Sequence, residues 1–113
     1  MSFSEFSIVY ITFPNEVEAK KLAKKLVQEN LVNFANVMPL MQTYYREIKG
    51  AVELDAEVMV MAKIRTSQAE EIIGYISEQH PVNSAPEIYT VPISHMSSLL
   101  ADNLKANLKS RKS

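Results

Sequence analysis

The sequence predicts a single α+β domain with four strands and three helices. Segments with the apolar runs typical of strands are interspersed with segments in which apolar residues have helical spacing. Their order along the chain is strand, helix, strand, strand, helix, strand, helix. The length agrees with this, because 113 residues, 47% of them hydrophobic, are enough for one core. We therefore interpret residues 1–113 as one domain.

The first predicted unit is a buried strand followed by a one-sided helix. Residues Phe6–Phe13, FSIVYITF, have almost no polar break, as expected of a strand covered on both faces. Asn15, with Glu18 three residues later, predicts a capped helix start. Apolar residues from Ala19 to Val27 then recur at three- and four-residue steps between lysines, which predicts a helix lying on a sheet.

A hairpin is predicted next. Residues from Val32 to about Glu47 are extended in character. Pro39 lies inside this segment and has no N–H to donate to a ladder, so we expect an edge strand or a bulge there. Lys49 and Gly50 supply a turn into the partner strand, predicted over Glu57–Ile64.

The second half repeats the pattern and adds a helix. Ser67 and Glu70 predict a capping box at the start of a second helix, which ends before Pro81. The segment HPVNSAP has loop composition, and Glu87–Ile93 reads as a short final strand. Apolar spacing from Met96 to Leu108 predicts a C-terminal helix.

This order of elements predicts the ferredoxin-like βαββαβ arrangement with an extra C-terminal helix. In that arrangement both inner helices cover one face of an antiparallel sheet. The middle strands are apolar on both sides, so the other face needs the third helix or another subunit as a cover. The pattern therefore predicts an oligomer.

Composition argues against several classes of function. Twelve basic against 13 acidic residues leave no positive excess for nucleic acid, and no apolar run approaches the roughly 20 residues that span a membrane. The start of the sequence lacks a secretory pattern, which favours a cytoplasmic address. Without cysteine there is no disulfide or thiolate site. No catalytic constellation stands out, because Ser94 and His95 are sequence neighbours, which rarely have nucleophile and base geometry. We expect no enzyme.

Four methionines carry thioethers, which suit Cu(I). They are Met38, Met41, Met59 and Met61. We favour core packing for them, because Met38 and Met41 should point to opposite sides of their strand. All four converge in one subunit only if the strand bulges at Pro39.

The two histidines, His80 and His95, are the candidate imidazole ligands for a metal. His80 is predicted at a helix C-terminus, where a positive charge is stabilised. We therefore favour a capping role for His80 over metal ligation.

The segment Asn15 to Pro39, NEVEAKKLAKKLVQENLVNFANVMP, resembles the signature of the CutA family of divalent-cation-tolerance proteins. The resemblance continues through Tyr44 and Tyr45, the Lys-x-Arg-Thr motif of residues 63–66, and the Pro-Glu-Ile and Pro-Ile motifs before residue 94. It implies a compact homotrimer whose edge strands and hairpins pair across subunits. It also implies a link to copper and other divalent metals, none of them required for folding, and a PII-like architecture that regulates rather than catalyses.

The resemblance implies a binding pocket near a subunit boundary. Family positions that gather there correspond to Tyr45, Lys63, Arg65 and Glu87. Ion pairing between subunits is the competing interpretation, since a charged pair across an interface fixes its register without a ligand.

The chain departs from the family pattern in three places. The family cysteine, expected at Phe34 or Ala35, is absent, which excludes a thiolate site there. The hairpin carries Tyr-Arg-Glu-Ile-Lys-Gly, with one extra residue before Glu57, and HPVNSAPEI also has one extra residue. A pocket built from these segments should therefore differ in shape.

Two functional hypotheses follow. The first is a trimeric, non-enzymatic metal-tolerance or signalling protein that binds copper or another divalent metal weakly through imidazoles, such as those of His80 and His95, and carboxylates. The alternative is a trimeric assembly scaffold that presents surfaces to an unidentified protein partner and has no physiological metal.

Overall fold

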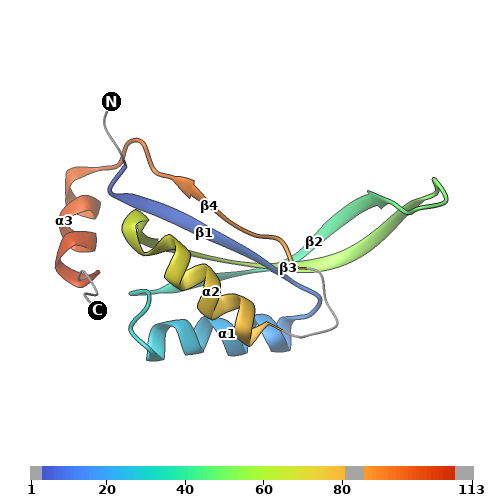
Figure 1. Cartoon of the computed structure of the whole chain (residues 1–113), viewed down its shortest axis with the longest axis horizontal. Helices are drawn as coiled ribbons and strands as arrows, with labels where there is room; N and C mark the ends of the chain where they lie inside the picture. Colours follow the sequence, from blue (N-terminus) through green and yellow to red (C-terminus); the bar gives the residue numbers. More distant parts are fainter. Residues whose placement is uncertain (1–3, 81–85, 109–113) are drawn as a thin grey trace.

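A four-stranded antiparallel sheet forms the body of the molecule in the computed structural model, which describes residues 4–80 and 86–108 (Figure 1). The strand order is β2-β3-β1-β4. The strands are β1 (Phe6–Phe13), β2 (Ala35–Arg46), β3 (Val52–Arg65) and β4 (Ile88–Pro92). The helices are α1 (Glu16–Gln28), α2 (Ala69–Gln79) and α3 (Ser98–Asn107). The α+β class and the ferredoxin-like order are confirmed.

One face of the sheet packs on α1 and α2 to form the core. The sheet residues in this core are Val9, Ile11, Phe13, Val58, Val60, Ala62 and Ile64. Leu22 and Leu26 of α1 and Ile72 and Ile76 of α2 pack against them. Each of these large side chains is at most 4% exposed, and burial of one contributes about 1.5–3 kcal/mol.

The predicted helix cap is confirmed at α1 and is wrong at α2. The Asn15 side chain accepts a hydrogen bond from the Glu18 N–H at 2.9 Å, as predicted. The Ser67 capping box is wrong, because the chain leaves β3 directly into a 3-10 turn, η1 (Thr66–Gln68), and Gln68 precedes α2 without a side-chain cap. Ser67 lies inside that turn, whereas a cap needs extended backbone.

In the hairpin of β2 and β3, the second strand is longer than predicted. β3 begins at Val52, five residues before the expected Glu57, and Val52 pairs with Arg46. Its outer half projects past the helices (Figure 1). The Cα radius of gyration of 15.5 Å exceeds the value of about 13 Å for a compact chain of this length, in keeping with the projecting arm.

The predicted irregularity at Pro39 is confirmed. β2 is an edge strand, and Met38 pairs with Met59 while Met41 pairs with Glu57. One extra residue is therefore present on β2 between these two pairs, which is a β-bulge. Leu40 lies within it at a φ of 32°, and Pro39 needs no ladder hydrogen bond there.

The opposite face of the sheet is mostly without a helix. The residues that the register places on this uncovered face include Ile8, Tyr10, Met38, Met41, Met59, Met61, Tyr89 and Val91. They are half-buried or exposed, and Tyr10 stacks on Tyr89 with ring centroids 5.2 Å apart. Only one end of this face is covered, where Phe6 packs against Leu104 and Leu108 around α3 (Figure 1).

Candidate functional site

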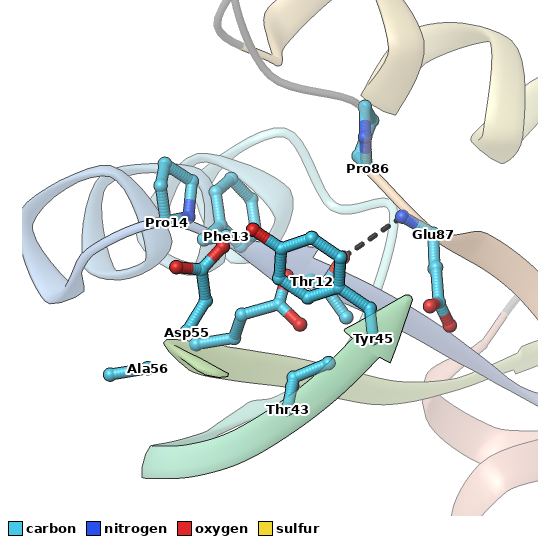
Figure 2. A pocket seen from close by; sticks show the side chains of 10 residues that line it. Thr12, Phe13, Pro14, Thr43, Tyr45, Asp55, Ala56, Pro86 and Glu87 are labelled. Atoms are coloured by element: carbon cyan, nitrogen blue, oxygen red, sulfur yellow. Dashed lines mark hydrogen bonds between the residues drawn. The ribbon is translucent and has the colours of Figure 1, made fainter. Parts of the chain in front are cut away.

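A cavity of about 580 Å³ lies where the projecting hairpin leaves the body of the sheet. We call it the hairpin-base pocket. Three parts of the chain line it: the end of β1 with Pro14, the β2–β3 hairpin, and the residues Pro86 and Glu87 just before β4 (Figure 2). The lining residues with polar side chains are Thr12, Thr43, Tyr45, Asp55, Glu57 and Glu87. Three acidic residues therefore line one hollow.

The register of the hairpin explains which of its side chains reach the pocket. Thr43 pairs with Asp55, and Tyr45 pairs with Glu53. Residues two apart on a strand share a face, so Thr43 and Tyr45 on β2 lie on one side with Asp55 and Glu57 on β3. Figure 2 shows the Tyr45 ring across the hollow, with its hydroxyl on the side of Asp55.

Asp55 controls the ionisation of Tyr45. Its negative charge is the largest cause that raises the pKa of the Tyr45 phenol above 10.0, followed by burial and by a hydrogen bond to Asp55. Glu53 and Glu47 add to the effect. The phenol therefore stays protonated at neutral pH, with its O–H donating to the Asp55 carboxylate.

Hydrogen bonds at Thr12 fix the wall of the pocket. The Thr12 N–H donates to the Glu87 carbonyl at 3.1 Å, and the Glu87 N–H donates to Thr12 Oγ1 at 2.9 Å (Figure 2). His80 Nε2 lies 2.8 Å from the Thr12 carbonyl, which can only accept, so this nitrogen carries the proton. β1, β4 and the end of α2 are thereby joined at one residue.

His80 is the C-cap residue of α2, as the sequence indicated, and it is also buried. Its side chain is 7% exposed and stacks on the Phe13 ring with centroids 4.5 Å apart. Phe13 itself lines the pocket. His80 therefore supports the pocket from behind, with its Nε2 already bonded to the backbone.

His95 lies in a different part of the molecule. It is exposed in the segment between β4 and α3, with Nδ1 3.1 Å from Ser94 Oγ. His80 lies beyond the other end of β4, so the structure does not bring the two predicted imidazole ligands together. In the described residues no three His, Asp or Glu side chains are grouped closely enough to hold a metal ion.

The four residues of the predicted binding pocket separate into two groups. Tyr45 and Glu87 both line the hairpin-base pocket. Lys63 instead places its ammonium 5.0 Å from the centroid of the Phe34 ring. Arg65 lies at the α3 end of the sheet. In one subunit the pocket therefore contains the tyrosine and the carboxylate without the two predicted cations.

Arg65 ties the start of β1 to α3. Its guanidinium contacts the Glu5 carboxylate at 2.8 Å, donates to the Leu108 carbonyl, and lies 5.3 Å from the Phe6 ring centroid. These contacts give Arg65 a structural role in the single chain.

The pocket carboxylates have no cationic partner among residues 4–80 and 86–108. The ion pairs there join Lys20 to Glu16 and Arg65 to Glu5, both outside the pocket. Carboxylate and hydroxyl oxygens facing one hollow favour a positively charged ligand, by charge rather than by a complete coordination shell. Asp55 and Glu57 were not identified from the sequence, because acidic residues on an exposed strand also match a solvated surface.

Within residues 4–80 and 86–108, no helix has both the length and the apolar character needed to cross a membrane.

Comparison with known proteins identifies the family. The family model described as "CutA1 divalent ion tolerance protein" matches residues 7–106. The divalent-cation tolerance protein CutA of Thermus thermophilus is 32% identical over 100 residues, which cover 88% of this chain and 95% of that protein. The Xenopus laevis protein CutA homolog is 37% identical over 87 residues, 77% of this chain and 56% of that protein, so this chain spans only about half of its length.

Solved structures agree with the sequence matches. The divalent cation tolerance protein structure from Thermus thermophilus aligns with a TM-score of 0.79 at 31% identity, covering 92% of this chain and 99% of that one. The rice CutA1 crystal structure aligns with a TM-score of 0.83 at 26% identity, covering 96% and 98%. The resemblance seen in the sequence is thus confirmed by family model, relatives and fold, and the chain belongs to the CutA1 divalent-ion tolerance family.

Proposed function

We propose that this protein is a non-catalytic, homotrimeric divalent-cation tolerance protein that binds copper or another divalent metal weakly. The observation that carries the metal part is the hairpin-base pocket, which Asp55, Glu57 and Glu87 line without a cationic partner in the described residues. The family and its named relatives support a role in divalent-cation tolerance.

The donors in the pocket suit a weak site. Carboxylate oxygens bind hard and borderline divalent cations, but the described residues of one chain supply no grouped set of three ligands. We therefore attribute metal binding to the negative charge of the pocket. Tyr45 lies beside the carboxylates as a neutral hydrogen-bonding group. Donation of the His80 Nε2–H to the Thr12 carbonyl does not involve Nδ1, so the weak metal role of His80 stays a prediction.

The trimer is proposed from the uncovered face. Monomeric proteins rarely leave a large contiguous apolar surface in water, and here Met38, Tyr89 and Val91 are 42–44% exposed beside half-buried Tyr10 and Met61. Sister copies that cover this face would remove it from solvent. The light-scattering mass tests this: three times the 12.8 kDa chain supports the trimer, and the mass of a single chain overturns it.

Calorimetric titration with Cu(II) and Zn(II) tests the metal function. The proteins compared are the wild type, a pocket variant with Asp55→Asn and Glu87→Gln, and His95→Ala as the matched control away from the pocket. We expect binding heat in the wild type and in His95→Ala and its loss in the pocket variant. Equal heats in all three proteins overturn the pocket assignment.

The second candidate is an assembly scaffold that binds a protein partner without a physiological metal. The projecting hairpin favours it, because Tyr44, Ile48 and Val52 there are 64% or more exposed. Absence of Cu(II) and Zn(II) binding at the expected trimer mass would favour this candidate. The cytoplasmic address stays a prediction from the sequence.

A further inference from the structure

Four of the six methionines of the chain lie on the uncovered face of the sheet. Met38 on β2 is directly opposite Met59 on β3, and Met61 follows two residues later on the same side. Met41 is opposite Glu57, which is itself two residues from Met59. Met38, Met59, Met41 and Glu57 thus occupy four adjoining positions of one ladder.

The bulge in β2 creates this arrangement. Without the extra residue, Met41 would point to the helix-covered face, because side chains alternate along a strand. With it, Met41 returns to the face of Met38. Leu40 has a φ of 32°, a conformation that is rare for leucine and costs of the order of 1–3 kcal/mol. Backbone strain of this kind is concentrated at functional sites, and here it accompanies the bulge that places Met41 on the face of Met38.

The spacing permits a shared ligand. Residues directly opposite in an antiparallel pair have Cβ atoms about 4.5–5.5 Å apart, and diagonal neighbours are about 7–8 Å apart. Methionine has three rotatable side-chain bonds, so the sulfur atoms of Met38, Met41 and Met59 can reach a common point. Glu57 is directly opposite Met41 and also lines the hairpin-base pocket, so the three methionines adjoin that pocket.

Charge selects one end of the methionine cluster. Glu57 supplies a negative charge beside Met41 and Met59. Lys63 lies at the other end, two residues beyond Met61, with its ammonium over the Phe34 ring. A cation is therefore favoured at the Glu57 end, with Met61 outside the group that binds it.

We propose that Met38, Met41 and Met59, with Glu57 beside them, form a site for a soft monovalent cation, Cu(I) or its analogue Ag(I). Thioethers select soft ions, whereas the oxygen ligands of the hairpin-base pocket suit divalent ones. The ion binds as Cu(I), and no electron transfer is involved. This site differs from the proposed divalent-metal function in its ion and in its thioether ligands, shares only Glu57 with the hairpin-base pocket, and does not depend on that function.

Competition for Cu(I) without oxygen, against a coloured Cu(I) chelator, tests the proposal, and Ag(I) titration repeats it with an ion that resists redox change. The proteins are the wild type, the triple variant Met38→Leu, Met41→Leu and Met59→Leu, and Met96→Leu as the matched control. Met96 packs under α3, away from the cluster. Leucine has nearly the same volume as methionine, so the triple variant removes the sulfur atoms with little change in packing.

We expect one ion per chain in the wild type and in Met96→Leu, and at least tenfold weaker binding in the triple variant. Labelled methionine methyl groups provide a readout on the wild type alone: the resonances of Met38, Met41 and Met59 should shift with Ag(I), and that of Met96 should not. No binding by the wild type, or equal affinity in the triple variant, overturns the thioether site. Cu(II) and Zn(II) heats on the same proteins report separately on the pocket.

Discussion

At the scale of single residues, His80 joins segments that are far apart in the sequence. Its backbone N–H donates to the Ile76 carbonyl at the end of α2, and its ring reaches the Thr12 carbonyl at the end of β1. Thr12 in turn bonds Glu87 at the start of β4. One imidazole therefore holds the frame on which the hairpin-base pocket is built.

The first prediction concerns this imidazole. His80→Ala removes the bond to Thr12 and the stacking on Phe13, and it leaves a buried carbonyl without that donor. We expect the free energy of unfolding to fall by about 2–4 kcal/mol, measured by urea denaturation. The exposed His95→Ala should change it by about 0.5 kcal/mol or less. Equal stability of the two variants would show that the His80 contacts do not contribute.

The second prediction concerns Tyr45. Asp55→Asn removes the charge that chiefly raises the phenol pKa, so Tyr45 should ionise at a lower pH in an absorbance titration. Tyr45→Phe identifies the Tyr45 signal by subtraction. In the wild type the folded chain holds this proton more tightly than the unfolded chain. The stabilisation is therefore complete below the ordinary pKa of 10.0 and is lost as pH rises through the folded pKa. An unchanged titration in Asp55→Asn would contradict the assignment.

At the scale of secondary-structure elements, the helix caps and the β-bulge show which local sequence signals predict the structure correctly. Asn15 lies between β1 and α1 and belongs to neither element, so its side chain can cap α1. Ser67 follows a long strand without a break, and the continuous turn into α2 removes the extended position that a cap needs. Pro39 correctly marked the bulge, because its missing N–H excludes a regular ladder position whatever the tertiary context.

The third prediction compares these two candidate caps. Asn15→Ala removes an observed hydrogen bond to a helix N–H and should lower the free energy of unfolding by about 1 kcal/mol. Ser67→Ala removes a hydroxyl that caps no helix and should have an effect of about 0.5 kcal/mol or less. Chemical denaturation of both variants measures the difference. A larger loss in Ser67→Ala would mean that α2 is capped as the sequence first suggested.

The outer half of β3 was not predictable from apolar spacing. In β3, residues 52–56 are all exposed, so no core imposes an alternating pattern on them, and the sequence signal starts only where burial starts, at Val58. The hairpin-base pocket was also not predictable from apolar spacing. It combines the ends of β1 and β4 with the hairpin, and contacts of that sequence separation depend on the tertiary fold. The family resemblance supplied Tyr45 and Glu87, and the strand register supplied Asp55 and Glu57.

At the scale of the whole molecule, the two faces of the sheet have different roles. α1 and α2 bury one face almost completely, whereas α3 covers only the Phe6 end of the other. The sequence predicted this imbalance, since its middle strands are apolar on both sides. The same surface is where we place both subunit contacts and thioethers, which links assembly to metal chemistry.

The fourth prediction tests assembly through this face. Met61→Glu places a charge at the centre of the uncovered face, and we expect the light-scattering mass to fall toward 12.8 kDa while the circular dichroism of the fold persists. Leu99→Glu is the matched control, because Leu99 is 83% exposed on α3. If Met61→Glu keeps the wild-type mass, this face is not the subunit contact.

In this chain the residues that fold a single copy are largely separate from the residues of the projecting hairpin. Side chains of the body specify how a single copy folds, and the outer residues of the arm, from about 42 to 56, contribute little to that core. Substitutions in the arm can therefore accumulate over generations without a penalty in the folding of one copy. The Tyr-Arg-Glu-Ile-Lys-Gly tip lies in this exposed arm, so its sequence bears on what the arm contacts rather than on how one copy folds.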